Sequence, residues 1–204
     1  MPIFDKYKAI FVHIPKCAGT SISNVLAHSD PLFSDTDYRH FSLRKMKGRN
    51  LEHLTGQRLK LLAPIRFHRY YKFAFVRNPY DRMVSEFKWR SSWDPATKNE
   101  GFETMLEKIP YYRQRKEPHF YSAYSFLTNQ RGESIVDYVG KFETIDDDFV
   151  EIAQTLNLQT VLPKKNITNS EKVHYSSFYN KSSQSLVKQH FLEDFENFDY
   201  SKNF

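Results

Sequence analysis

The chain alternates short apolar runs with segments in which apolar residues recur every three or four positions. The runs Ala9–Ile14 and Phe73–Val76 predict buried strands, and Ile135–Phe142 predicts a third strand. Strands that alternate with helices favour a layered arrangement in which helices cover a sheet. The pattern therefore predicts an α/β fold, a three-layer domain with a mainly parallel central sheet flanked by helices.

The helices are predicted from apolar spacing and from residues that favour helix starts. Asn78 suits an N-cap and Pro79 the first helical position after it, and Thr144 begins a sequence similar to a capping box. Residues 29–50 are polar and basic and form the least structured stretch, whereas Pro110–Arg131 has little periodicity and is expected to be a surface excursion. The predicted helices cover Ile22–His28, Leu51–Leu62, Pro79–Trp89, Phe102–Ile109, Thr144–Leu158 and Ser182–Phe191.

Composition supports a folded protein. Of 204 residues, 40% are hydrophobic and 26% charged, and a chain of this length without repeats or linkers predicts a single domain over 1–204. The single cysteine excludes an internal disulfide and a cysteine-based zinc site. No apolar stretch approaches the roughly 20 residues of a membrane span, and the N-terminus lacks the layout of a secretion signal. We therefore expect a cytoplasmic protein without a transmembrane segment.

Charge is unevenly placed along the chain. The formal net charge is +6, yet Arg39–Arg90 alone carries 14 Lys and Arg against 3 Asp and Glu. A basic middle on an otherwise acidic chain indicates an anionic ligand or substrate that approaches one face. The alternative is a solvated lysine-rich surface.

A loop of small and polar residues, Lys16–Ser21, joins the first predicted strand to the first helix. In this geometry backbone N–H groups and the helix dipole bind phosphate, and Lys16, Thr20 and Ser21 add a charge and two hydroxyl donors. Lys16 precedes Gly19, which reverses the order of a Walker motif and weakens an ATPase interpretation. Ser23 stands where a cysteine phosphatase needs arginine. An ordinary turn between a strand and a helix is the remaining alternative.

A second phosphate-binding pair follows the next strand. Arg77 ends that strand and Ser85 lies about two turns into the following helix, both near the carboxyl edge of the sheet, where α/β folds bind ligands. A guanidinium fork with a hydroxyl is a good phosphate receptor. The alternatives are an ion pair of Arg77 with Asp81 and a plain helix serine at 85.

These two motifs resemble those of sulfotransferases that use 3′-phosphoadenosine 5′-phosphosulfate (PAPS). His13–Ser21 looks like their 5′-phosphosulfate loop, closest to the carbohydrate type that includes heparan sulfate 2-O-sulfotransferase and many small bacterial relatives, although these often have threonine where this chain has Cys17. Phe73–Ser85 is similar to their 3′-phosphate site. The resemblance implies a P-loop-like fold that binds PAPS and its product, 3′,5′-adenosine bisphosphate. The implied nucleotide-binding residues are Lys16, Cys17, Ala18, Gly19, Thr20, Ser21, Arg77 and Ser85.

The same resemblance suggests the catalytic residues. Lys16 would neutralise the bridging oxygen as it leaves, and His53 would be the base for the acceptor hydroxyl, with an ordinary pKa near 6.5 that suits this role. His40 is the alternative base. No metal is implied, because the histidines lack carboxylate partners at ligand spacing in the sequence.

The acceptor is the least determined part of the prediction. The basic stretch Arg39–Arg49 favours an acidic glycan or lipid headgroup, with a small hydroxylated metabolite as the alternative acceptor. The aromatic residues of Tyr111–Tyr112 and His119–Tyr121 are candidates to stack on sugars, and the alternative is that they form core. We predict an enzyme that moves the sulfuryl group of PAPS to a hydroxyl, in a carbohydrate rather than a nucleic acid. The alternatives are a P-loop kinase or hydrolase that requires ATP and magnesium, and a non-catalytic polyanion-binding protein.

Overall fold

The computed structural model describes residues 3–28, 52–159, 162 and 173–204. They fall into two compact units. The first unit comprises Met1–Val76 with Ser125–Lys164, and the second comprises Arg77–Tyr124 with Lys165–Phe204. The single domain over 1–204 stays a prediction.

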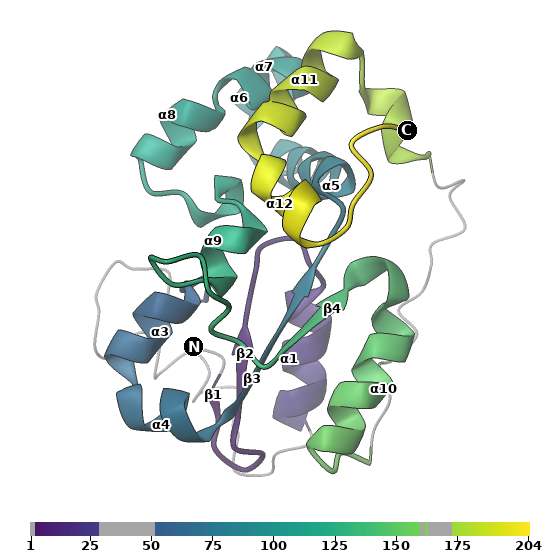
Figure 1. The fold of residues 1–204 in the computed structure, drawn as a ribbon. Coiled ribbons are helices and arrows are strands. Elements are labelled where there is room, and N and C mark those ends of the chain that lie inside the picture. The colour runs from purple at the N-terminus through teal and green to yellow at the C-terminus, as the bar shows by residue number, and fades with distance from the viewer. Residues whose placement is uncertain (1–2, 29–51, 160–161, 163–172) are drawn as a thin grey trace. The chain divides into compact units, whose positions relative to one another are not determined.

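A four-stranded sheet forms the centre of the first unit (Figure 1). Its strands lie in the order β1 (Ile3–Phe4), β2 (Ala9–Val12), β3 (Tyr71–Val76) and β4 (Tyr138–Lys141). β1 pairs antiparallel with β2, whereas β2, β3 and β4 run parallel. The mainly parallel α/β fold is thus confirmed. The two-residue β1 was not predicted, because two residues carry no period.

The parallel register determines where the loops leave the sheet. Val12 pairs with Ala74, and Val76 pairs with Lys141. The carboxyl ends of β2, β3 and β4 therefore meet at one edge, which is the edge at which parallel α/β folds bind ligands.

The helices of the first unit follow these strands. They are α1 (Gly19–His28), α3 (Gly56–Leu62), α4 (Pro64–Arg69) and α10 (Ile145–Thr155), with a 3-10 turn, η2 (Phe142–Thr144), before the last. Figure 1 shows α3 and α4 on one side of the strands and α1 and α10 on the other. The stretch 29–51, which includes the first residue of the predicted helix Leu51–Leu62, lies outside the described residues.

Several helix starts differ from the prediction, and α1 begins at Gly19 rather than at Ile22. α3 begins only at Gly56, because Thr55 serves as its N-cap and accepts a hydrogen bond from the backbone N–H of Arg58. The side chain of Thr144 does not cap α10, because its hydroxyl donates a hydrogen bond to Asp148 instead. Asp148 also accepts a hydrogen bond from the backbone N–H of Lys141, with 2.8 Å between N and O. The first turn of α10 is thus tied to the end of β4 by Asp148.

In the part of the second unit that the structure describes, the regular elements are helices. Its elements are α5 (Pro79–Ser91), α6 (Pro95–Glu100), α7 (Phe102–Glu107), α8 (Ile109–Gln114), η1 (Pro118–Phe120), η3 (Tyr175–Phe178), α11 (Lys181–His190) and α12 (Leu192–Asn197), and α9 (Ala123–Leu127) spans the boundary with the first unit. The predicted cap of α5 is confirmed, since Asn78 accepts a hydrogen bond from the backbone N of Tyr80 at 3.0 Å.

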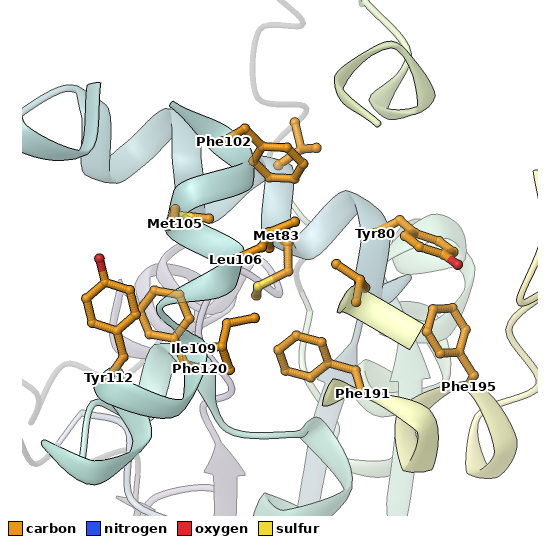
Figure 2. Packing of buried hydrophobic residues seen from close by; sticks show 12 residues of the cluster. Tyr80, Met83, Phe102, Met105, Leu106, Ile109, Tyr112, Phe120, Phe191 and Phe195 are labelled. Carbon is orange, nitrogen blue, oxygen red and sulfur yellow. The ribbon is translucent and has the colours of Figure 1, made fainter. Parts of the chain in front are cut away.

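An aromatic core holds these short helices together (Figure 2). Tyr112 stacks on Phe120 at 4.2 Å between ring centroids, and both are buried. The prediction of a surface excursion over Pro110–Arg131 is therefore wrong. Helices of five or six residues are too short to show a hydrophobic period, although they bury large side chains.

Candidate functional site

The loop after β2 has a strained backbone. Lys16 and Ala18 have positive φ angles of 66° and 60°, the left-handed region, which costs a residue with a side chain about 1–2 kcal/mol. Such turns point successive backbone N–H groups into a concavity that binds anions. α1 begins directly afterwards at Gly19 with no acidic residue in its first turn, so its positive end faces the loop without a competing carboxylate. The loop thus has the backbone form expected for phosphate binding.

A close approach of two residues fixes this loop. A Cβ atom at Gly19 would overlap the ring of His13 at Nε2, so only glycine fits there. His13 is 4% exposed and its ring stacks on Phe11 with 5.5 Å between centroids. The start of α1 is therefore packed directly on the residue that follows β2.

The loop side chains differ in exposure. Lys16 and Ser21 are half-buried and Thr20 is exposed, so all three predicted side-chain donors reach the surface of the loop. The Cys17 side chain is 1% exposed, and its thiol lies 3.6 Å from the carbonyl oxygen of Pro15. Cys17 thus makes a contact inside the loop. Its predicted role in nucleotide binding stays a prediction.

The predicted base lies beside this loop. Nδ1 of His53 is 3.1 Å from the carbonyl oxygen of His13, which is 40 residues earlier in the chain. The two imidazole rings meet edge to face at 4.5 Å. The fold thus brings His53 next to His13, the residue between the end of β2 and the loop. His40 lies outside the described residues.

Glu52 completes a cluster that the sequence did not reveal. Its Oε1 lies 3.5 Å from Nδ1 of His13, and one ligand atom from each of His13, Glu52 and His53 lies within 4.8 Å of the other two. The fold thus brings histidines and a carboxylate together that the sequence did not pair at ligand spacing, and the absence of a metal stays a prediction. His13 reaches the cluster only through the fold; the adjacent pair Glu52-His53 was the one signal in the sequence.

Arg77 and Ser85 belong to the second unit, where Arg77 directly precedes Asn78, the N-cap of α5, and Ser85 lies inside that helix. Nε of Arg77 donates to Oδ2 of Asp81 at 2.8 Å, and the two side chains are 14% and 27% exposed. Asp81 and Ser85 are four residues apart and share one face of the helix. The ion pair considered as an alternative is thus present. It engages Nε, which is one of the five N–H donors of the guanidinium.

The aromatic residues proposed to stack on sugars are partly core residues. Tyr112 and Phe120 are 8% and 0% exposed, so for both the alternative of a core position holds and sugar stacking does not. His119 stacks on Trp89 at 4.9 Å, and its Nδ1 lies 2.7 Å from Glu86. Tyr111 is 53% exposed. The basic stretch Arg39–Arg49 lies outside the described residues.

Comparison with known proteins gives a consistent result. The model of the sulfotransferase family matches residues 1–201. Carbohydrate sulfotransferase 12 of Mus musculus is 21% identical over 202 residues, which cover 78% of this chain and 48% of that protein. Carbohydrate sulfotransferase 10 of Gallus gallus is 24% identical over 240 residues, 97% of this chain and 65% of that protein. The chain thus spans about half to two thirds of the length of these relatives. No solved structure gives a significant match.

Two predictions that go beyond the family itself are not tested by these comparisons. One is the special likeness to heparan sulfate 2-O-sulfotransferase, and the other is the cytoplasmic location. Among the described residues, no helix has the length and apolar character needed to cross a membrane.

Proposed function

The chain belongs to the sulfotransferase family, and we propose that it transfers the sulfuryl group of PAPS to a hydroxyl of a carbohydrate. The family match, the two carbohydrate sulfotransferases among its relatives and the form of the loop after β2 support this proposal. The observation that carries it is the position of His53 beside that loop.

The hydrogen bond of His53 suits a general base. If Nδ1 carries the proton and donates it to the His13 carbonyl, then Nε2 is the acceptor nitrogen, and the ring is held in a fixed orientation. A base positioned in this way contributes about 10²–10⁴-fold to the rate. We assign the removal of the acceptor's proton to Nε2 of His53.

The loop provides the charge that the transfer needs. The acceptor oxygen forms a bond to sulfur while the bond from sulfur to the bridging phosphate oxygen breaks, and His53 takes the acceptor's proton. Lys16 and the first N–H groups of α1 stabilise the negative charge that develops on the leaving phosphate. The leaving group is 3′,5′-adenosine bisphosphate, and Lys16 is the residue we assign to its bridging oxygen.

Arg77 and Ser85 are assigned to the 3′-phosphate. The guanidinium of Arg77, just before α5, and the hydroxyl of Ser85 on that helix would form a charge-assisted receptor for it. ATP has no 3′-phosphate, so this contact would distinguish PAPS from ATP. A kinase or hydrolase would show the opposite preference and require magnesium.

Calorimetric titration with 3′,5′-adenosine bisphosphate, ADP and ATP tests the donor site. We expect the bisphosphate to bind most tightly and Arg77→Ala to weaken it by about 10–100-fold, the effect of losing a hydrogen bond to a charged group. Arg69→Ala, which removes an exposed arginine of α4, is the matched control and should bind like the wild type. Tighter binding of ATP, or no nucleotide binding, would overturn the proposal.

The catalytic assignment has a separate test. His53→Ala should lower kcat for sulfuryl transfer from PAPS to a glycan by about 10²-fold or more, with little change in affinity for the bisphosphate. His68→Ala, an exposed histidine of α4, is the control. Unchanged transfer by His53→Ala would contradict its role as the base.

A further inference from the structure

The cluster of His13, Glu52 and His53 has the spacing of a metal site. At the usual zinc–nitrogen distance of about 2.0–2.1 Å, two ligands of a tetrahedral ion lie about 3.4 Å apart. Nδ1 of His13 and Oε1 of Glu52 are 3.5 Å apart, and the ligand atoms of all three residues lie within 4.8 Å of one another. A small rotation of side chains would bring the third ligand to the same spacing.

The fold has already oriented the two histidines. The His13 ring is packed between Gly19, which it meets at Nε2, and Phe11, and this leaves its Nδ1 on the side of Glu52. Nδ1 of His53 faces the carbonyl of His13, an outer hydrogen bond that is typical of metal-ligating histidines. Both rings are therefore held in place by neighbours other than the metal.

The burial of the cluster indicates an open site. The side chain of His13 is 5% exposed, whereas that of Glu52 is 41% exposed. An ion can therefore reach the cluster from the side of Glu52, and the described residues offer it three protein ligands. Two histidines and a glutamate are a donor set that zinc uses in enzymes, and imidazole nitrogen favours zinc, copper and nickel over magnesium or calcium.

We propose that His13, Glu52 and His53 bind one divalent transition-metal ion, such as Zn²⁺, and that the bound ion inhibits sulfuryl transfer. The binding rests on geometry alone; the inhibition rests on the proposed function. A histidine nitrogen that donates its lone pair to a metal cannot accept a proton from the acceptor hydroxyl. Zinc and the transfer reaction therefore compete for His53.

Zinc binding is measured directly on the chelator-treated full chain, in competition with a metal-sensitive dye and without nucleotide. We expect one zinc per chain, with Glu52→Gln and His53→Ala each weakening it by about ten-fold or more. Substitution with Co²⁺ should give the intense visible absorption of a four-coordinate ion. His68→Ala and Glu107→Gln, both exposed, are controls for general loss of histidine or glutamate and should bind zinc like the wild type.

The inhibition is measured as the zinc concentration that halves transfer. We expect Glu52→Gln to raise this concentration by about the same factor as its zinc dissociation constant, and a chelator to restore activity. His13 is left unchanged because its replacement would disturb the packing on Gly19. Zinc binding that is absent, or equal in wild type, Glu52→Gln and His53→Ala, would overturn the site.

The two proposals fail separately. A chain that binds zinc through these residues but transfers no sulfuryl group would refute the proposed function and leave the metal site standing. A chain that transfers sulfate through His53 yet binds zinc elsewhere, or retains full activity with zinc bound, would refute this inference alone.

Discussion

The two units each contain an arginine–aspartate pair, and the two pairs differ in their exposure to solvent. In the first unit, the pair Arg66–Asp5 lies at the surface, with side chains 46% and 59% exposed. In the second unit, the side chains of Arg82 and Asp194 are 1% and 2% exposed. A buried ion loses several kcal/mol of solvation and a surface ion almost none. Breaking the buried pair should therefore change the free energy of unfolding much more than breaking the surface pair.

The second unit compensates for this burial with aromatic rings and backbone groups. The Arg82 guanidinium lies 4.8 Å over the ring of Phe191 and donates to the carbonyl of Tyr121 at 2.8 Å. Asp194 accepts the backbone N–H groups of Ala123 and Tyr124, each at 2.9 Å. Short helices expose many backbone N–H groups, and here a buried carboxylate satisfies two of them at the start of α9.

The first unit keeps polar groups where a ligand can reach them. Its sheet residues from Ala9 to Val12 and from Phe73 to Val76 are all buried and apolar. The side chains assigned to binding or catalysis lie beyond the strand ends and are partly exposed; they are Lys16, Glu52 and His53. The pair Arg82–Asp194 of the second unit therefore serves stability, whereas these groups of the first unit are accessible to a ligand.

The largest expected effect is the loss of one partner of the buried pair. Arg82→Met leaves the Asp194 carboxylate buried without its opposite charge, so we expect the free energy of unfolding to fall by about 3–5 kcal/mol. Burial already raises the pKa of Asp194 against the opposing effect of Arg82. Trp89 and Trp93 are the two tryptophans of the chain and both belong to the second unit, so their fluorescence during denaturant unfolding reports this loss.

A double variant separates the pair from general damage to the core. In Arg82→Met/Asp194→Asn no charge is left unpaired, so its destabilisation should be smaller than the sum of the two single effects. Destabilisations that simply add would show that the two charges do not stabilise each other, and the contrast between the units would then rest on packing alone.

Local signals made part of this fold predictable. The short apolar runs Ala9–Ile14 and Phe73–Val76 predict two buried strands, and β2 and β3 lie there, with β2 ending at Val12. The start of α5 was predictable from two residues, Asn78 as the N-cap and Pro79 as the first helical residue. The loop from Lys16 was found because lysine, glycine and hydroxyl residues stand together in the chain.

Contacts distant in sequence could not be predicted in the same way. His13 meets Glu52 and His53 only because the first unit folds around the end of β2. Tyr112 and Phe120 lie in a segment expected at the surface because α8 and η1 are too short to show a period, and packing within the aromatic core buries them. The sequence pattern thus predicts helices and strands that have strong local signals. It does not predict sites whose residues come together only when the chain packs.

An intermediate effect is expected at the loop of the first unit. Gly19→Ala forces the added methyl group against the His13 ring, which Phe11 also confines, so we expect a loss of about 1–3 kcal/mol of stability. Because the loop must shift, affinity for 3′,5′-adenosine bisphosphate should fall as well. Hydrogen exchange of the β2 and β3 amides measures the first effect, and calorimetry the second.

The control for that variant is Ala18→Gly. Ala18 has a φ of 60°, which glycine adopts without strain, so this change should leave stability within about 1 kcal/mol of the wild type. If Gly19→Ala is as stable as Ala18→Gly and binds the bisphosphate normally, then the contact with His13 does not constrain the loop.

The smallest effect is expected at the surface pair of the first unit, and it has a defined pH dependence. Partial burial raises the pKa of the Asp5 carboxyl, but hydrogen bonds from Arg66 and Tyr70 outweigh it, so the pKa is lowered overall. A lowered folded-state pKa stabilises the protein above the unfolded value near 3.9, and this stabilisation is lost as pH falls through the folded value. Asp5→Asn should therefore cost less than about 1 kcal/mol at pH 7 and nothing once the wild-type carboxyl is protonated.

Denaturant unfolding of Asp5→Asn and wild type between pH 2 and 7 measures this difference, and salt at about 1 M should reduce it because the pair is exposed. The buried Asp194 has the opposite sign: its pKa is raised, so its ionisation lowers stability as pH rises from the unfolded value toward the folded one. A cost at Asp5 that grows as pH falls, or that equals the effect of Arg82→Met, would contradict the distinction between surface and buried charge in the two units.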